Sequence, residues 1–104
     1  MSPDLLTEIT ARLVSEARPL KVILFGSRAR GSDDPRSDID LIVVEREVEN
    51  PYREMIRLRR ALRGLATPID LLVISERDFD EKKTWSETVY YWAHREGRTL
   101  YEAA

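Results

Sequence analysis

The stretch VILFGSRARGSDDPRSDIDLIVV, residues 22–44, decides the fold of this chain. It opens with an unbroken apolar run over residues 22–25, which is typical of a strand that is buried on both faces. Gly26 and Ser27 break that run, and a polar, turn-rich segment then leads to a second apolar run over residues 39–44. The stretch therefore predicts two buried strands joined by a polar connection.

Helical periodicity and a third apolar run flank this stretch. Apolar residues recur at helical spacing before Pro19, at Leu5, Leu6, Ile9 and Leu13. A second helix is expected after Asn50, with an apolar stripe formed by Met55, Leu58, Leu62 and Leu65. A third strand is expected over residues 69–74. We therefore expect an α/β (α+β) fold, a small mixed β-sheet flanked by helices, in a single domain over residues 1–104.

The C-terminal third carries two capping patterns. The segments 75–78 and 84–87 both fit the capping box, which predicts a short turn followed by a helix that ends before Gly97. Trp85, Val89 and Trp92 are expected to line one face of that helix. Their helical spacing favours core packing for the two tryptophans.

Composition excludes several kinds of chemistry. The 104 residues contain no cysteine, which excludes disulfide scaffolds, thiolate zinc sites and cysteine nucleophiles. His94 is the single histidine, so a multi-histidine metal site is excluded, and His94 itself is expected to be a surface or cap residue. No apolar run approaches the length of a membrane span. The net charge of −2 argues against general nucleic-acid binding, and we expect a cytoplasmic setting with no membrane contact.

Asp38 and Asp40 are the first candidates for a catalytic site. Residues i and i+2 of a strand point to the same face, so these carboxylates are expected to lie side by side. Two like charges so close need a cation, a shared proton or full hydration, and Mg²⁺ takes carboxylate oxygens together with substrate phosphates. Asp70 adds a third acid, and if the last two strands are neighbours the three converge as in two-metal sites. The alternative is that these aspartates cap turns or pair with arginines.

Gly26 and Ser27 are the second candidate feature. A glycine after a buried strand lets a phosphate approach the backbone, and the Ser27 hydroxyl adds a donor. Arg28 and Arg30 follow and add positive charge beside this turn, with solvated surface arginines as the alternative.

The segments GSRARGSDDPRSDIDLIVV and PIDLLVIS resemble the nucleotidyltransferase superfamily related to DNA polymerase beta. The short length and the ending HREGRTLYE resemble its minimal nucleotidyltransferases (MNT), and the resemblance covers essentially the whole chain. It implies that Gly26 and Ser27 hold the nucleotide phosphates and that Asp38 and Asp40 bind two Mg²⁺ ions. It also implies that Asp70 is the third metal carboxylate and helps activate the attacking hydroxyl.

The resemblance further implies a reaction and a partner. Many minimal nucleotidyltransferases are antitoxins that silence a cognate HEPN-domain RNase toxin by moving AMP from ATP to a toxin tyrosine. We therefore expect AMPylation of such a toxin, ATP as the substrate, and a hetero-oligomer with the toxin.

Two other functions stay open. The chain could neutralise a toxin by binding alone, through an arginine-rich helix face or an aromatic cluster, formed by Arg53, Arg57, Arg60 and Arg63 and by Trp85, Tyr90, Tyr91 and Trp92. A nucleotidyltransferase that acts on a small molecule or on RNA would instead need no protein partner.

Overall fold

The fold was analysed in a computed structural model that describes residues 3–26, 29, 38–65 and 67–104. In these residues four strands form one sheet in the order β3-β2-β1-β4. The strands are β1 (Lys21–Phe25), β2 (Ile39–Glu45), β3 (Ile69–Ser75) and β4 (Arg98–Glu102). β2 and β3 are parallel, whereas β1 runs antiparallel to both β2 and β4. The predicted mixed sheet is therefore confirmed.

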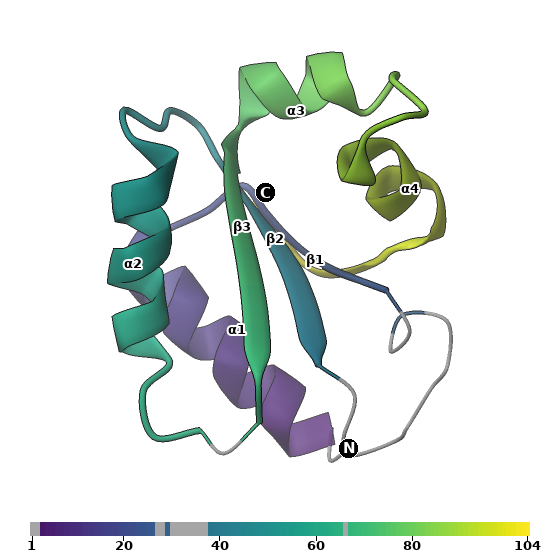
Figure 1. The fold of residues 1–104 in the computed structure, drawn as a ribbon. Coiled ribbons are helices and arrows are strands. Elements are labelled where there is room, and N and C mark those ends of the chain that lie inside the picture. The colour runs from purple at the N-terminus through teal and green to yellow at the C-terminus, as the bar shows by residue number, and fades with distance from the viewer. Residues whose placement is uncertain (1–2, 27–28, 30–37, 66) are drawn as a thin grey trace.

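Within the same described ranges, two helices cover each face of the sheet (Figure 1). The helices are α1 (Pro3–Ala17), α2 (Pro51–Ala61), α3 (Glu76–Lys82) and α4 (Val89–Glu96). A larger core cluster joins α1 and α2 to one face of the strands, at residues such as Leu24, Leu41 and Val43. A smaller cluster joins α3 and α4 to the opposite face, at Ile23, Ile42, Val44, Ile74, Phe79 and Ala93. This alternation is expected of strands that are covered on both sides.

Side-chain caps start three of the helices. Asn50 begins α2, Ser75 begins α3, and each accepts a hydrogen bond from the backbone N–H three residues further on. The second capping pattern, at 84–87, does not start a helix. Thr88 caps α4 instead, and its hydroxyl also donates to the carbonyl of Lys82. His94 is exposed in the last turn of α4, as expected.

The later start of α4 overturns the expected core packing of the tryptophans. Trp85 precedes the helix, and Trp85, Val89 and Trp92 are 41%, 37% and 50% exposed. Ala93 is buried instead, and Tyr90 packs against the smaller core cluster. A helix of only eight residues buries a narrow stripe, and its first residue decides which side chains belong to that stripe.

The strand β4 was not predicted. Its sequence RTLYE has no apolar run and no regular alternation, and only Leu100 and Tyr101 pack against the larger core cluster. β4 pairs with β1 on one side and lies at the edge of the sheet. Edge strands are often short and polar, so they give a weak sequence signal.

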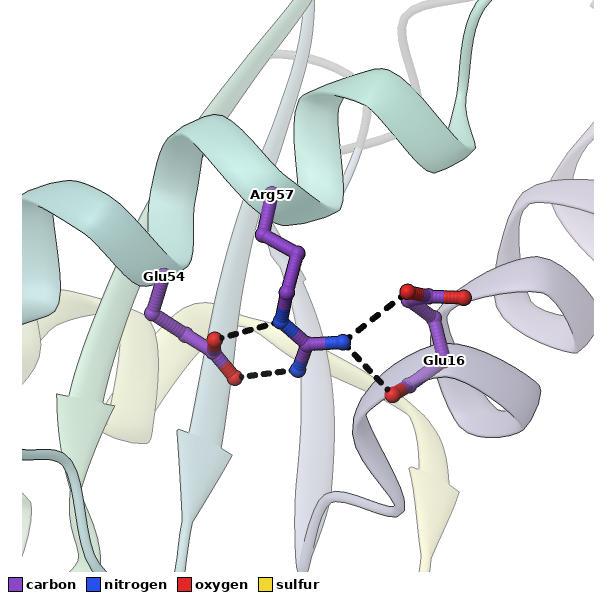
Figure 2. A network of polar contacts seen from close by, with 3 residues as sticks. All are labelled: Glu16, Glu54 and Arg57. Carbon is purple, nitrogen blue, oxygen red and sulfur yellow. Dashed lines mark hydrogen bonds and ion pairs between the residues drawn. The ribbon is translucent and has the colours of Figure 1, made fainter.

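An arginine joins α1 to α2, the two helices on the face with the larger core cluster (Figure 2). The guanidinium of Arg57 donates two hydrogen bonds to Glu54, at 2.8 and 2.7 Å. Its Nη1 atom also donates to the carboxylate and the backbone carbonyl of Glu16, at 2.9 and 3.0 Å. Because one planar group satisfies both partners, the contact fixes the approach of the two helices.

The described helices include none that is both long and apolar enough to cross a membrane.

Candidate active site

Two of the three predicted carboxylates lie next to each other at the start of the parallel strand pair. Asp40 on β2 is the register partner of Asp70 on β3. Strand alternation places both on the face covered by α3 and α4, because Ile42 and Ile74 further along the same strands belong to the core cluster of that face. Those helices cover the later part of the strands, so Asp70 remains exposed and Asp40 half-buried.

The electrostatics of Asp40 reflect this crowding. The pKa of Asp40 is raised, first by partial burial and then by the negative charges of Asp70 and Asp38. A side-chain hydrogen bond with Asp70 raises it further. Since like charges at short range oppose ionisation, the pair is stabilised by a proton or by a cation. A carboxylate pair with this repulsion has the chemistry of a divalent-cation site.

Gly26 closes this site from the side of β1. Its backbone has φ +76°, and a Cβ built on it would lie 2.5 Å from Oδ2 of Asp40. Its neighbour Phe25 is the register partner of Asp40 in the antiparallel pair. The turn after β1 therefore packs directly against the carboxylate, which explains in steric terms why the chain has glycine here.

The other predicted site residues are not joined to this carboxylate pair in the same way. Asp38 is exposed and lies one residue before β2, which begins at Ile39, and its negative charge contributes to the raised pKa of Asp40. Ser27, Arg28 and Arg30 lie outside the described residues. Within the described ranges, no group of three or more His, Cys, Asp and Glu side chains could hold a metal ion. The structure thus joins Asp40 and Asp70, with Asp38 acting on Asp40 through its charge.

Sequence reasoning missed Arg59. Its Nη2 atom lies 3.8 Å from Oδ1 of Asp70, and both side chains are exposed. Arg59 was one of several arginines on the polar side of the predicted helix, and no local pattern separates it from the others. Only the packing of α2 beside β3 selects it.

Paired aspartates at the start of β2 and β3 of a four-stranded mixed sheet fit a metal-assisted transfer of a phosphoryl or nucleotidyl group. The chain belongs to the polymerase beta nucleotidyltransferase family, because residues 7–103 match the family described as "Polymerase beta, Nucleotidyltransferase". The resemblance inferred from the sequence is therefore confirmed at the level of the family.

Two known proteins extend this assignment. The chain is 40% identical over 86 residues to "Putative protein adenylyltransferase MJ0604" of Methanocaldococcus jannaschii, and the alignment covers 78% of this chain and 77% of that protein. It is also similar to the crystal structure of "a putative nucleotidyltransferase from Sulfolobus solfataricus", with a TM-score of 0.65 and 26% identity. That similarity covers 95% of this chain and 78% of the other. Both support a nucleotidyltransferase.

Proposed function

We propose that the chain is an Mg²⁺-dependent protein adenylyltransferase that moves AMP from ATP to a tyrosine of a cognate HEPN-type RNase toxin and thereby acts as its antitoxin. The observation that carries the transferase chemistry is the register pairing of Asp40 with Asp70 beside Gly26. The name of the 40% identical relative supports a protein as the acceptor. The toxin as the particular target rests on the resemblance to minimal nucleotidyltransferases.

The reaction replaces a phosphoanhydride bond of ATP by a phosphoester bond to the tyrosine. The tyrosine oxygen bonds to the α-phosphorus of ATP, and the bond from that phosphorus to the bridging oxygen of pyrophosphate breaks. The hydroxyl proton passes to a carboxylate, for which Asp70 is suited because it is exposed and next to Asp40. Pyrophosphate leaves with the bridging oxygen and its electron pair, so the protein gains AMP.

The carboxylates fit the cation that this chemistry uses. Asp40 and Asp70 offer only oxygen atoms, and the negative charge of Asp70 adds to burial in raising the pKa of Asp40. The family resemblance implies Asp38 as a third ligand, although the described side chains do not gather the three carboxylates into one metal-binding group. When bound there, Mg²⁺ lowers the pKa of the attacking hydroxyl and offsets the charge of the triphosphate.

Three residues have different roles around the proposed reaction site. The absence of a side chain at Gly26 leaves room for the Asp40 carboxylate and lets a phosphate approach the backbone. Arg59 lies at the outer side of Asp70 and compensates its charge. The exposure of Asp70 gives an acceptor hydroxyl access from solvent, which a site for a protein substrate requires.

The proposal is tested by transfer of label to the protein encoded beside this chain. Wild type, Asp40→Asn and Asp70→Asn are incubated with that partner, Mg²⁺ and ATP labelled at the α-phosphate. Asp80→Asn is the matched control, because Asp80 is an exposed acid of α3 that pairs only with Lys83 among the contacts described. We expect label on a partner tyrosine with wild type and Asp80→Asn, and none with the other two variants.

Two outcomes would favour the alternative functions. Suppression of toxicity by Asp40→Asn without any label would show an antitoxin that acts by binding alone. Transfer to a small molecule or to RNA in the absence of a protein partner would overturn the protein acceptor.

A further inference from the structure

A hollow of about 200 Å³ lies between the end of β1 and α4. Its lining consists of Phe25, Gly26, Val89, Trp92, Ala93, Glu96 and Gly97. In Figure 1 the end of β1 passes below α4. The hollow therefore opens on the same face of the sheet as α3 and α4.

Gly26 connects this hollow to the site. It lines the hollow, and its α-carbon is also the position from which a Cβ would meet Asp40 Oδ2. Phe25 likewise lines the hollow and is the register partner of Asp40. Gly26 and Phe25 therefore join the hollow to the Asp40 carboxylate.

The hollow has a rigid aromatic wall. The indole N–H of Trp92 donates to the carbonyl of Ser86 at 2.9 Å, which fixes the orientation of the ring. Tyr91 packs edge-on against Trp92, with ring centroids 5.0 Å apart and an interplanar angle of 84°. Even so, Trp92 is half exposed. An immobilised and accessible indole is a surface on which a planar ring can stack.

Glu96 adds a polar group to this otherwise apolar lining. A carboxylate only accepts hydrogen bonds, so it selects ligands that present a donor. The exocyclic amine of adenine is such a donor, whereas a carbonyl at the same position of the ring is not. An aromatic wall with one acceptor is suited to a planar base that carries an amino group.

We propose that this hollow binds the base of the nucleoside triphosphate, with the ring stacked on Trp92 and its exocyclic amine donating to Glu96. The inference rests on the proposed function, since it takes the triphosphate to lie at Gly26 and the carboxylates. It assigns the preference for an amino-bearing base to α4, an element that the aspartate and glycine-serine motifs do not include.

The test separates base binding from phosphate binding. Binding of ATP, inosine triphosphate and inorganic tripolyphosphate is measured by calorimetry in the presence of Mg²⁺. We expect Trp92→Ala to weaken ATP binding by roughly 10-fold or more while tripolyphosphate binding stays unchanged. Trp92→Phe keeps an aromatic face and should restore most of the affinity for ATP. Trp85→Ala is the control, because Trp85 is similarly exposed but does not line the hollow.

The role of Glu96 is tested by the ratio of the affinities for ATP and inosine triphosphate. Wild type should bind ATP more tightly than inosine triphosphate, which carries a carbonyl in place of the amine, and Glu96→Gln should reduce that preference. Unchanged ATP affinity in Trp92→Ala, or equal affinity of wild type for the two nucleotides, would overturn the base site. Transfer of label that still depends on Asp40 would then leave the proposed function intact, whereas failure of wild type to bind any triphosphate would overturn both.

Discussion

The carboxylate of Asp40 fills the space in which a side chain of Gly26 would lie. A Cβ on Gly26 would be 2.5 Å from Oδ2 of Asp40, a separation that real Cβ atoms essentially never show. The backbone of Gly26 also has φ +76°, a region that residues with a side chain rarely adopt. Two separate constraints therefore favour glycine at this position, and one of them concerns the Asp40 carboxylate directly.

Substitution Gly26→Ala should reduce nucleotidyl transfer by at least about 10-fold, because Asp40 must turn away from its position beside Asp70. It should also lower the free energy of unfolding by about 1–2 kcal/mol through the strained backbone. Transfer rates and denaturant unfolding measure the two effects.

Gly64→Ala provides the matched control. Gly64 has φ +92°, but nothing lies within 4 Å of a Cβ built there. This variant should therefore lose a similar free energy of unfolding and keep its transfer rate. A parallel loss of activity in both variants would show that the contact with Asp40 has no special role.

Asp40→Asn should abolish activity and at the same time stabilise the fold. The raised pKa of Asp40 means that its ionised form opposes folding above that pKa, because burial and the charges of Asp70 and Asp38 penalise it. A neutral amide removes this penalty, so the urea midpoint without Mg²⁺ should rise at pH 8. Transfer should fall on the order of 100-fold or more, since the proposed cation ligand is lost. A lower midpoint would contradict the charge repulsion described for the pair.

The buried carboxyl of Glu45 should make stability depend on pH. Glu45 is 8% exposed, and burial together with the hydrogen bond and the negative charge of Glu54 raises its pKa to about 8. Because this folded-state pKa exceeds the ordinary value of 4.5, Glu45 favours folding fully below about pH 4.5. That contribution is lost progressively as the pH rises towards 8.

Glu45→Gln cannot ionise and should remove this dependence. The variant should be more stable than wild type by roughly 1–2 kcal/mol at pH 8.5 and similar to it near pH 5, as measured by denaturant unfolding. The exposed Glu47 is the control site, where a change to glutamine should leave the pH profile of unfolding unaltered. A Glu45→Gln profile that parallels wild type would mean that Glu45 is ionised in the folded protein.

Arg57→Ala should separate stability from catalysis. The substitution removes the hydrogen bonds to Glu54 and Glu16 in Figure 2, and because these groups are partly exposed the expected loss is about 1–2 kcal/mol. Arg57→Lys should recover little, because lysine lacks the planar pair of donors. Label transfer below the unfolding transition should be unchanged in both variants, and reduced transfer would show that α2 positions the site.

Local sequence determined the buried strands, the start of α2 and the positions of the acids. Strands β1, β2 and β3 are apolar runs, and Asn50 caps a helix where predicted, whereas Ser75 caps the helix α3 where only a short turn was expected. Such signals are local, because an apolar run or a cap needs only its neighbours in the chain. The polar edge strand β4 and the true start of α4 have no comparable signal, so the sequence did not reveal them.

The tertiary structure decided which residues the acids and the aromatic side chains lie beside. Only the parallel pairing of β2 with β3 places Asp40 beside Asp70, and only the turn after β1 brings Gly26 against that carboxylate. The phase of α4 turned Trp92 away from the core and towards a hollow at the site. These relationships depend on contacts between segments far apart in the chain. A sequence pattern fixes which face a side chain belongs to, whereas the packing of whole elements fixes what lies opposite it.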